Sequence, residues 1–87
     1  LDSFSPDAVR LHYNLGLAMT AMGDRDEAIA EFRVVTHQRP DWAPGWSQLG
    51  SAYLAKRQWE KAVPALETAA TSSGVLGPPA IGAWMMG

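Results

Sequence analysis

Apolar residues recur at intervals of three and four along most of this 87-residue chain, which is the spacing of one face of an α-helix. The first two runs are Leu11, Leu15, Ala18, Met19 and Met22, then Ala28, Ile29, Phe32 and Val35. Gly23 and Asp24 separate these runs, and Asp24 followed three positions later by Glu27 is typical of a capping box that opens a helix. The pattern predicts helices near residues 7–21, 25–37, 42–55 and 59–72.

The second half of the chain repeats the first at an offset of 34 residues. The identical pairs are Pro6 and Pro40, Asp7 and Asp41, Leu15 and Leu49, Gly16 and Gly50, Ala18 and Ala52, Ala21 and Ala55, and Ala28 and Ala62. Repetition at a fixed period of this length is the mark of a helical repeat array, in which each unit is one pair of helices. The repeat therefore predicts an all-α fold built from two equivalent helical pairs.

Small residues recur where the two helices of a pair must meet. Gly16 and Gly50 lack a side chain at equivalent positions, although glycine inside a helix costs about 1 kcal/mol relative to alanine. Because this cost recurs in both units, we interpret both glycines as points of close helix–helix approach. Pro64 removes a backbone donor early in the fourth helix, which predicts a kink and leaves a break in that helix open.

Seven residues of the second unit carry a family signature: Trp46, Leu49, Gly50, Tyr53, Ala62, Leu66 and Ala69. In type and spacing they resemble the tetratricopeptide repeat, a helix-turn-helix unit of about 34 residues. Three positions depart from the pattern, because His12 stands for tryptophan, Arg57 for glycine and Gly74 for proline. The resemblance implies a segment of a right-handed superhelical solenoid, with one repeat over residues 6–39 and a second over 40–74.

The two ends of the chain are expected to belong to neighbouring repeats. Residues 1–5 precede Pro6, the image of Pro40 at the 34-residue offset, and are expected to end a preceding repeat. Residues 75–87 are expected to form a linker and the start of a third repeat. Pro78 and Trp84 keep the separation of Pro40 and Trp46. The uncharged tail is expected to pack on the last helix of the second unit, with contact to a partner protein or a membrane protein as alternatives.

The composition narrows the classes of partner. The formal net charge is −2 and the basic residues are scattered from Arg10 to Lys61, so no nucleic-acid-binding surface is expected. No run approaches the roughly 20 apolar residues of a membrane span, and the first residues lack the order of a signal peptide. The absence of cysteine leaves the compartment undetermined.

The sequence offers no constellation suited to catalysis, a metal or a cofactor. His12 and His37 lie in different helices without neighbouring ligands, and we interpret His12 as a half-buried substitute for the signature tryptophan. No serine stands in a nucleophile elbow, and the glycines of residues 74–79 lack a phosphate-binding lysine. The acidic residues Asp24, Asp26, Glu27 and Glu31 are expected to form a solvated helix start and outer helix face.

The resemblance to tetratricopeptide repeats implies a function in protein binding. In that family the first helix of each repeat lines a concave groove, and the corresponding residues here are Arg10, Tyr13, Asn14, Leu17 and Thr20, then Ser47, Gln48, Ser51 and Leu54. Trp84 is added as a residue that could contact a partner. The chain is expected to be a non-catalytic scaffold that binds a peptide or helix of another protein. A permanently associated subunit of a larger assembly, possibly beside a membrane, is the alternative; a catalytic domain outside these residues is neither supported nor excluded.

Overall fold

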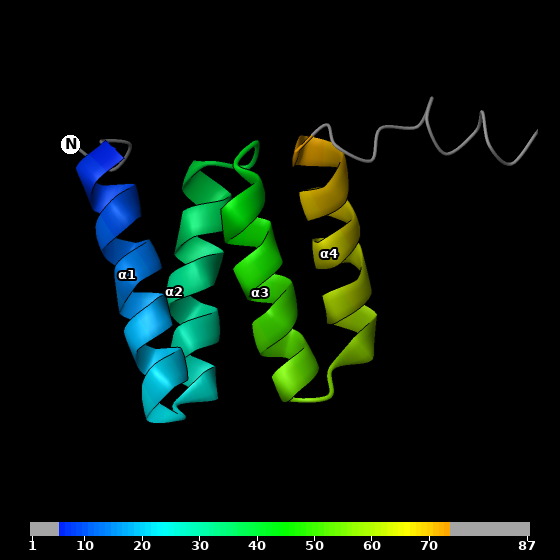
Figure 1. Ribbon diagram of the computed structural model, residues 1–87, viewed down its shortest axis with the longest axis horizontal. Helices are drawn as coiled ribbons and strands as arrows, with labels where there is room; N and C mark the ends of the chain where they lie inside the picture. The colour runs from blue at the N-terminus through cyan, green and yellow to red at the C-terminus, as the bar shows by residue number, and fades with distance from the viewer. Residues whose placement is uncertain (1–5, 74–87) are drawn as a thin grey trace, which may run out of the picture.

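The computed structural model describes residues 6–73, which form four α-helices in a row (Figure 1). They are α1 (Pro6–Met22), α2 (Arg25–Gln38), α3 (Ala43–Ala55) and α4 (Trp59–Ser73). Each helix agrees with its predicted range to within one residue at either end, and the all-α prediction is confirmed. The expectations for residues 1–5, for the tail and for Trp84 fall outside the described residues.

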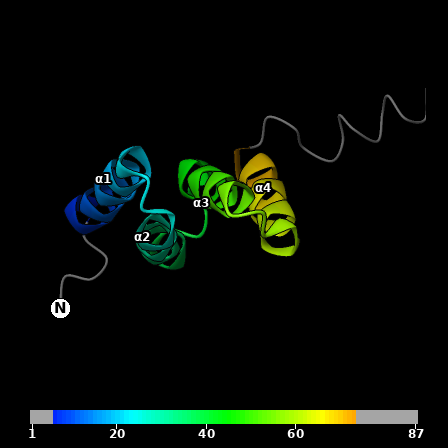
Figure 2. The ribbon, with the colours of Figure 1, turned by 90° about the horizontal axis from the view of Figure 1, so that it is seen from below.

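Each helix packs on the next one in the chain, so the four helices form two adjacent pairs. Seen along the helices in Figure 2, α1 and α3 lie toward one side of the row, and α2 lies toward the other. The first helices of the two repeats thus lie on the same side, as the resemblance implies. A ligand on that side would meet residues from both repeats.

The core forms where α2 meets α1 and α3. Ala28, Phe32, Leu49 and Ala52 are buried together, and Tyr13, Met19, Ile29, Trp46 and Tyr53 pack around them. Phe32 is 0% exposed and is one of the two largest fully buried side chains, with Val35 as the other. Since α2 contributes residues to both neighbours, the core joins the two repeats.

The two repeated glycines lie at close helix–helix contacts, as predicted. A Cβ atom added to Gly16 would lie 2.5 Å from Cε1 of Phe32, and one added to Gly50 would lie 2.6 Å from Cδ2 of Leu66. Contacts this short do not form, because non-bonded carbons pack at about 3.5–4.0 Å. Glycine therefore lets α1 approach α2, and α3 approach α4, at equivalent points.

Both helical pairs turn through the same backbone motif. The amide of Asp24 donates to the carbonyl of Met19 at 2.9 Å, and the equivalent amide of Gln58 donates to Tyr53, also at 2.9 Å. This bond closes a Schellman motif, in which the residue just past the helix adopts a left-handed conformation. That residue is Gly23 in the first repeat, with φ 83°, and Arg57 in the second, with φ 60°. Among the described residues, Arg57 is the one non-glycine with positive φ.

Replacing Arg57 by glycine is expected to stabilise the chain by about 1 kcal/mol, because a side chain in the left-handed region costs about 1–2 kcal/mol. A domain of this size should then melt about 4–8 °C higher, measured by circular dichroism. Gly23→Ala is the matched control and should lower the melting temperature, since it places a side chain at the equivalent left-handed position. An Arg57→Gly chain that melts no higher than the parent would contradict this account.

Two local predictions for the second and fourth helices have different outcomes. The Asp24 side chain caps α2 by accepting from the amide of Glu27 at 3.3 Å, as predicted. The amide of Asp24 donates to Met19 in the turn, so only this half of the capping box forms. Pro64 does not break α4, which runs as one helix from Trp59 to Ser73, and the kink expected there stays a prediction.

Candidate groove between the first and third helices

The residues predicted to line a groove lie on the two helices that share one side of the row. Arg10, Tyr13, Asn14, Leu17 and Thr20 are on α1, and Ser47, Gln48, Ser51 and Leu54 are on α3. All are exposed except Tyr13 and Gln48, which are half-buried. Three of them, Thr20, Gln48 and Ser51, meet in one hollow of about 170 Å³ between α1 and α3.

The hollow is lined by both apolar and polar side chains. Ala28, Ala52 and Ala55 contribute methyl groups, and the polar side chains come from Thr20, Arg25, Gln48 and Ser51. The Thr20 hydroxyl donates to the carbonyl of Gly16 at 2.9 Å, so its oxygen retains lone pairs that can accept a hydrogen bond. We call the set Thr20, Arg25, Gln48 and Ser51 the A-helix hollow.

Sequence reasoning missed Arg25. It is the first residue of α2, directly after the capping residue Asp24, whereas the family resemblance implies groove residues only on the first helix of each repeat. The tight turn at Gly23 brings the start of α2 back beside the end of α1. An exposed guanidinium therefore adds a positive charge and several donors to the A-helix hollow.

Two exposed leucines continue this surface along the helices. Leu17 is 37% exposed and lies three residues before Thr20 on α1, and Leu54 is 40% exposed and lies three residues after Ser51 on α3. Residues three apart lie on the same helix face. The A-helix hollow thus has an apolar neighbour on each helix, whereas Arg10 and Asn14 are exposed but do not line the hollow.

Tyr13 has a different setting from the other predicted groove residues. Its ring makes edge contacts with Phe32 at 5.9 Å and Trp42 at 4.9 Å between ring centroids. Gln48 Nε2 donates to the Tyr13 hydroxyl at 3.5 Å. Tyr13 therefore connects α1 to α2 and to the second repeat, and its replacement would disturb the packing of the helices as well as the surface.

His12 is half-buried, as predicted, but its contact with Glu31 shows that the prediction for Glu31 was wrong. His12 Nδ1 lies 2.6 Å from Oε1 of Glu31, whose side chain is only 19% exposed. Glu31 was expected on a solvated outer face, but it contacts α1 instead. Its image, Ala65, is buried in the second repeat, where Trp46 replaces His12 and donates to the carbonyl of Pro40 at 2.8 Å.

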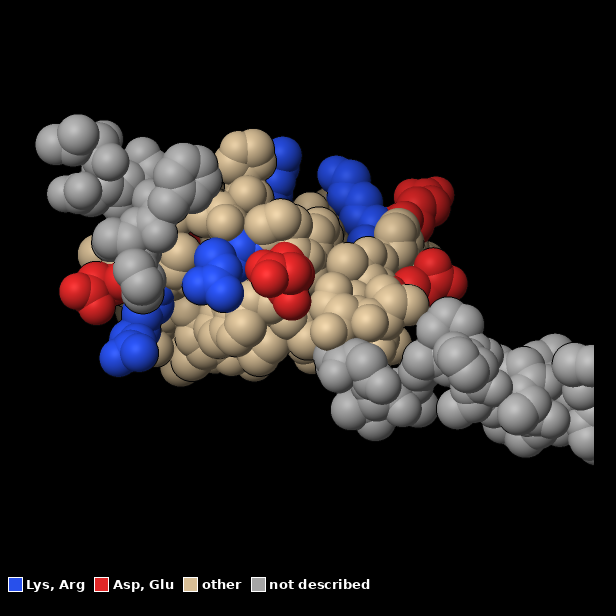
Figure 3. All heavy atoms as spheres, turned by 90° about the horizontal axis from the view of Figure 1, so that it is seen from above, with Lys and Arg blue, Asp and Glu red and all other residues tan. Residues whose placement is uncertain are grey.

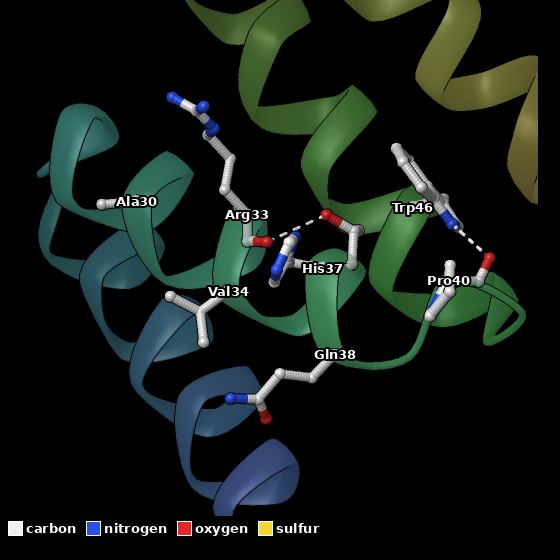
Figure 4. A pocket seen from close by; sticks show the side chains of 8 residues that line it. Ala30, Arg33, Val34, His37, Gln38, Pro40 and Trp46 are labelled. Carbon is white, nitrogen blue, oxygen red and sulfur yellow. Dashed lines mark hydrogen bonds between the residues drawn. The ribbon is translucent and has the colours of Figure 1, made fainter. Parts of the chain in front are cut away.

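A broader hollow of about 730 Å³ lies beside the end of α2, and the sequence did not indicate it. Figure 4 shows Arg33, His37 and Gln38 along α2, with Pro40 and Trp46 across the turn to α3. Oε1 of Gln38 is buried and accepts no hydrogen bond from any of residues 6–73. These residues come from the second helix of the first repeat and the turn after it, so this surface is distinct from the A-helix hollow.

The described residues show no charged patch on the face drawn in Figure 3, no metal site and no membrane-spanning helix. On the face shown in Figure 3, basic and acidic side chains are interspersed and do not gather into a patch of one sign. Over residues 6–73, no three histidine, cysteine or acidic side chains are grouped so that they could hold a metal ion. In the same part of the chain, no helix has the length and apolar character needed to cross a membrane.

Comparison with known protein families assigns both repeats. Residues 11–41 match one family model of the tetratricopeptide repeat, and residues 46–73 match a second. A search of curated proteins finds no match to this chain. The two matched ranges fall on α1 with α2 and on α3 with α4, so each match covers one helical pair.

Proposed function

Because the chain belongs to the tetratricopeptide repeat family, whose repeats generally serve as protein–protein interaction modules, we propose that it binds a peptide or helix of a partner protein along α1 and α3. The observation that supports this most directly is the A-helix hollow, where side chains of both repeats converge. No reaction is assigned to the chain. It acts by holding another protein.

The side chains of the A-helix hollow suit a polar peptide segment with one acidic side chain. Gln48 can donate and accept, Ser51 can do both, and Arg25 can donate two parallel bonds to a carboxylate. Leu17 and Leu54 offer apolar contacts on either side. An extended or helical peptide could use these groups together, since pockets for side chains supply specificity in both binding modes.

Filling the A-helix hollow is expected to weaken binding. Peptides selected from a randomised display library on the immobilised parent chain are titrated against Ser51→Tyr and Leu17→Ala by fluorescence anisotropy. Ser51→Tyr should raise Kd more than tenfold, which corresponds to about 1.4 kcal/mol. Leu17→Ala should raise Kd by about threefold to tenfold, because it removes part of the roughly 1.5–3 kcal/mol that full burial of leucine gives.

Two controls keep this test specific to the A-helix hollow. Ser72→Tyr makes the same substitution at an exposed serine near the end of α4, and Glu27→Gln removes an exposed charge at the start of α2. Both should leave Kd within about twofold, because neither residue lines the A-helix hollow. Peptides that bind Ser51→Tyr as tightly as the parent, but lose affinity for Ser72→Tyr, would place the site elsewhere.

The alternative, a permanently associated subunit, is favoured by one observation. Leu15 on α1 is 36% exposed, whereas its image Leu49 on α3 is only 4% exposed, and Ala18 is exposed where Ala52 is buried. The face of α1 that corresponds to the packed face of α3 is thus uncovered among residues 6–73. Sedimentation of the chain separates the two functions: a soluble monomer favours reversible peptide binding, and concentration-independent association favours the subunit.

A further inference from the structure

The second repeat has a surface equivalent to the one that α3 covers in the first repeat. In the first repeat, α3 lies over α2, and Val35 and Thr36 are buried beneath Gly45. A Cβ atom added to Gly45 would lie 2.8 Å from Cγ1 of Val35 and 3.6 Å from Cγ2 of Thr36. Because valine stands at position 35 of α2, this contact requires glycine at position 45 of α3.

The images of these residues in the second repeat form an open hollow. Ala69 and Ala70 stand 34 residues after Val35 and Thr36, and they are half-buried rather than buried. They line a hollow of about 520 Å³ together with Tyr13 of α1 and with Ala43, Pro44, Ser47, Gln48 and Leu66. We call the six residues Ala43, Pro44, Ser47, Leu66, Ala69 and Ala70 the terminal face. It lies where α4 meets α3, and α4 is the last helix of the row in Figure 1.

The chain itself contains a segment that matches the terminal face. Residues 78–87 follow α4 after a short linker and carry no charged side chain. Pro78 and Trp84 keep the separation of Pro40 and Trp46, and in the second repeat the Trp46 ring nitrogen donates to the carbonyl of Pro40 at 2.8 Å. In the register set by Pro78 and Trp84, Ala83 corresponds to Gly45.

The residue types on the two sides of this contact change together. A methyl group in the place of Gly45 would collide with the γ carbon of valine, yet Ala69 has no γ carbon. Alanine at position 83 therefore fits against alanine at position 69, as glycine fits against valine between the two described repeats. Uncharged side chains also let the segment be buried without the cost of desolvating an ion.

We propose that residues 78–87 dock on the terminal face of the same molecule, with Ala83 against Ala69 and Trp84 in the place that Trp46 takes in the second repeat. In this register seven residues, 74–80, connect α4 to the position equivalent to Ala43, whereas four, 39–42, connect α2 to α3, so the connection is long enough. Ser47 and Gln48 line the same hollow, and Gln48 also belongs to the A-helix hollow, so the docked tail borders the proposed peptide site. The test below needs no peptide, so its outcome does not depend on the proposed function.

Hydrogen–deuterium exchange of the full 87-residue chain tests the proposal through the amides of residues 80–87. In the parent these amides should exchange about tenfold more slowly than in Ala69→Val, because docking protects them and a valine γ carbon at position 69 would collide with Ala83. The double variant Ala69→Val/Ala83→Gly restores the residue pair seen at Val35 and Gly45. It should restore the slow exchange.

Controls separate docking from loss of the fold and from other occupants. Ala21→Val makes the same substitution at an exposed position of α1 and should leave residues 80–87 protected. Circular dichroism should show unchanged helix content in Ala69→Val. Unprotected amides in the parent, equal exchange in parent and Ala69→Val, or no recovery in the double variant would each overturn the proposal. So would protection that rises with protein concentration, because a second copy would then be the occupant.

Discussion

Phe32→Ala is expected to be the most destabilising single truncation in the described residues, at about 3–5 kcal/mol. The ring is 0% exposed, belongs to the core cluster and contacts the edge of Tyr13 at a centroid distance of 5.9 Å. A cavity here would loosen α1 from α2 and the first repeat from the second. Since a chain of this size is stabilised by about 4–13 kcal/mol in total, this single truncation should remove a large share of its stability.

Urea unfolding followed by circular dichroism measures this loss against two matched variants. Leu66→Ala truncates the image of Phe32 in the second repeat, where the side chain is only half-buried, and should cost about 2 kcal/mol. Phe32→Leu installs the residue of the second repeat in the first and should cost less than about 1.5 kcal/mol. If Phe32→Ala and Leu66→Ala unfold at the same urea concentration, the core does not centre on α2 as described.

Leucine at either repeated glycine is expected to force the paired helices apart. Overpacking of a close contact costs about 1–3 kcal/mol, and the better helix propensity of leucine offsets up to about 1 kcal/mol of that cost. The loss should be larger at Gly16, where an added Cβ meets three ring carbons of the buried Phe32 at 2.5–2.8 Å. At Gly50 the added atom meets Cδ2 and Cγ of Leu66 at 2.6 Å and its backbone nitrogen at 3.4 Å. The half-buried Leu66 side chain can rotate away in part, whereas the fully buried Phe32 ring cannot.

Thermal melting of Gly16→Leu and Gly50→Leu checks both the sign and the order of the two effects. A net loss of 1 kcal/mol should lower the melting temperature by about 4–8 °C. Gly50→Leu is expected to lower it measurably, and Gly16→Leu is expected to lower it further. A Gly50→Leu chain as stable as the parent would show that α3 and α4 do not need glycine at their contact.

The number, type and bounds of the helices could be predicted from the sequence because these features depend on local spacing and on the repeat. Periods of three and four place one face of each helix in the core, and the offset of 34 residues reveals the close contacts at Gly16 and Gly50 before any packing is seen. Local interactions and repetition carry this information. The left-handed backbone at Arg57 was not predicted, although Arg57 stands where the first repeat has Gly23.

Contacts between helices that are distant in sequence were decided only by the tertiary structure. The pairing of His12 with Glu31, the ring contacts of Tyr13 and the entry of Arg25 into the A-helix hollow depend on how side chains of different helices face one another. The repeat register identifies equivalent positions, but it does not say which of them touch. Equivalent positions can also differ in burial, as Leu15 and Leu49 do, because a helix face is buried only where another helix covers it.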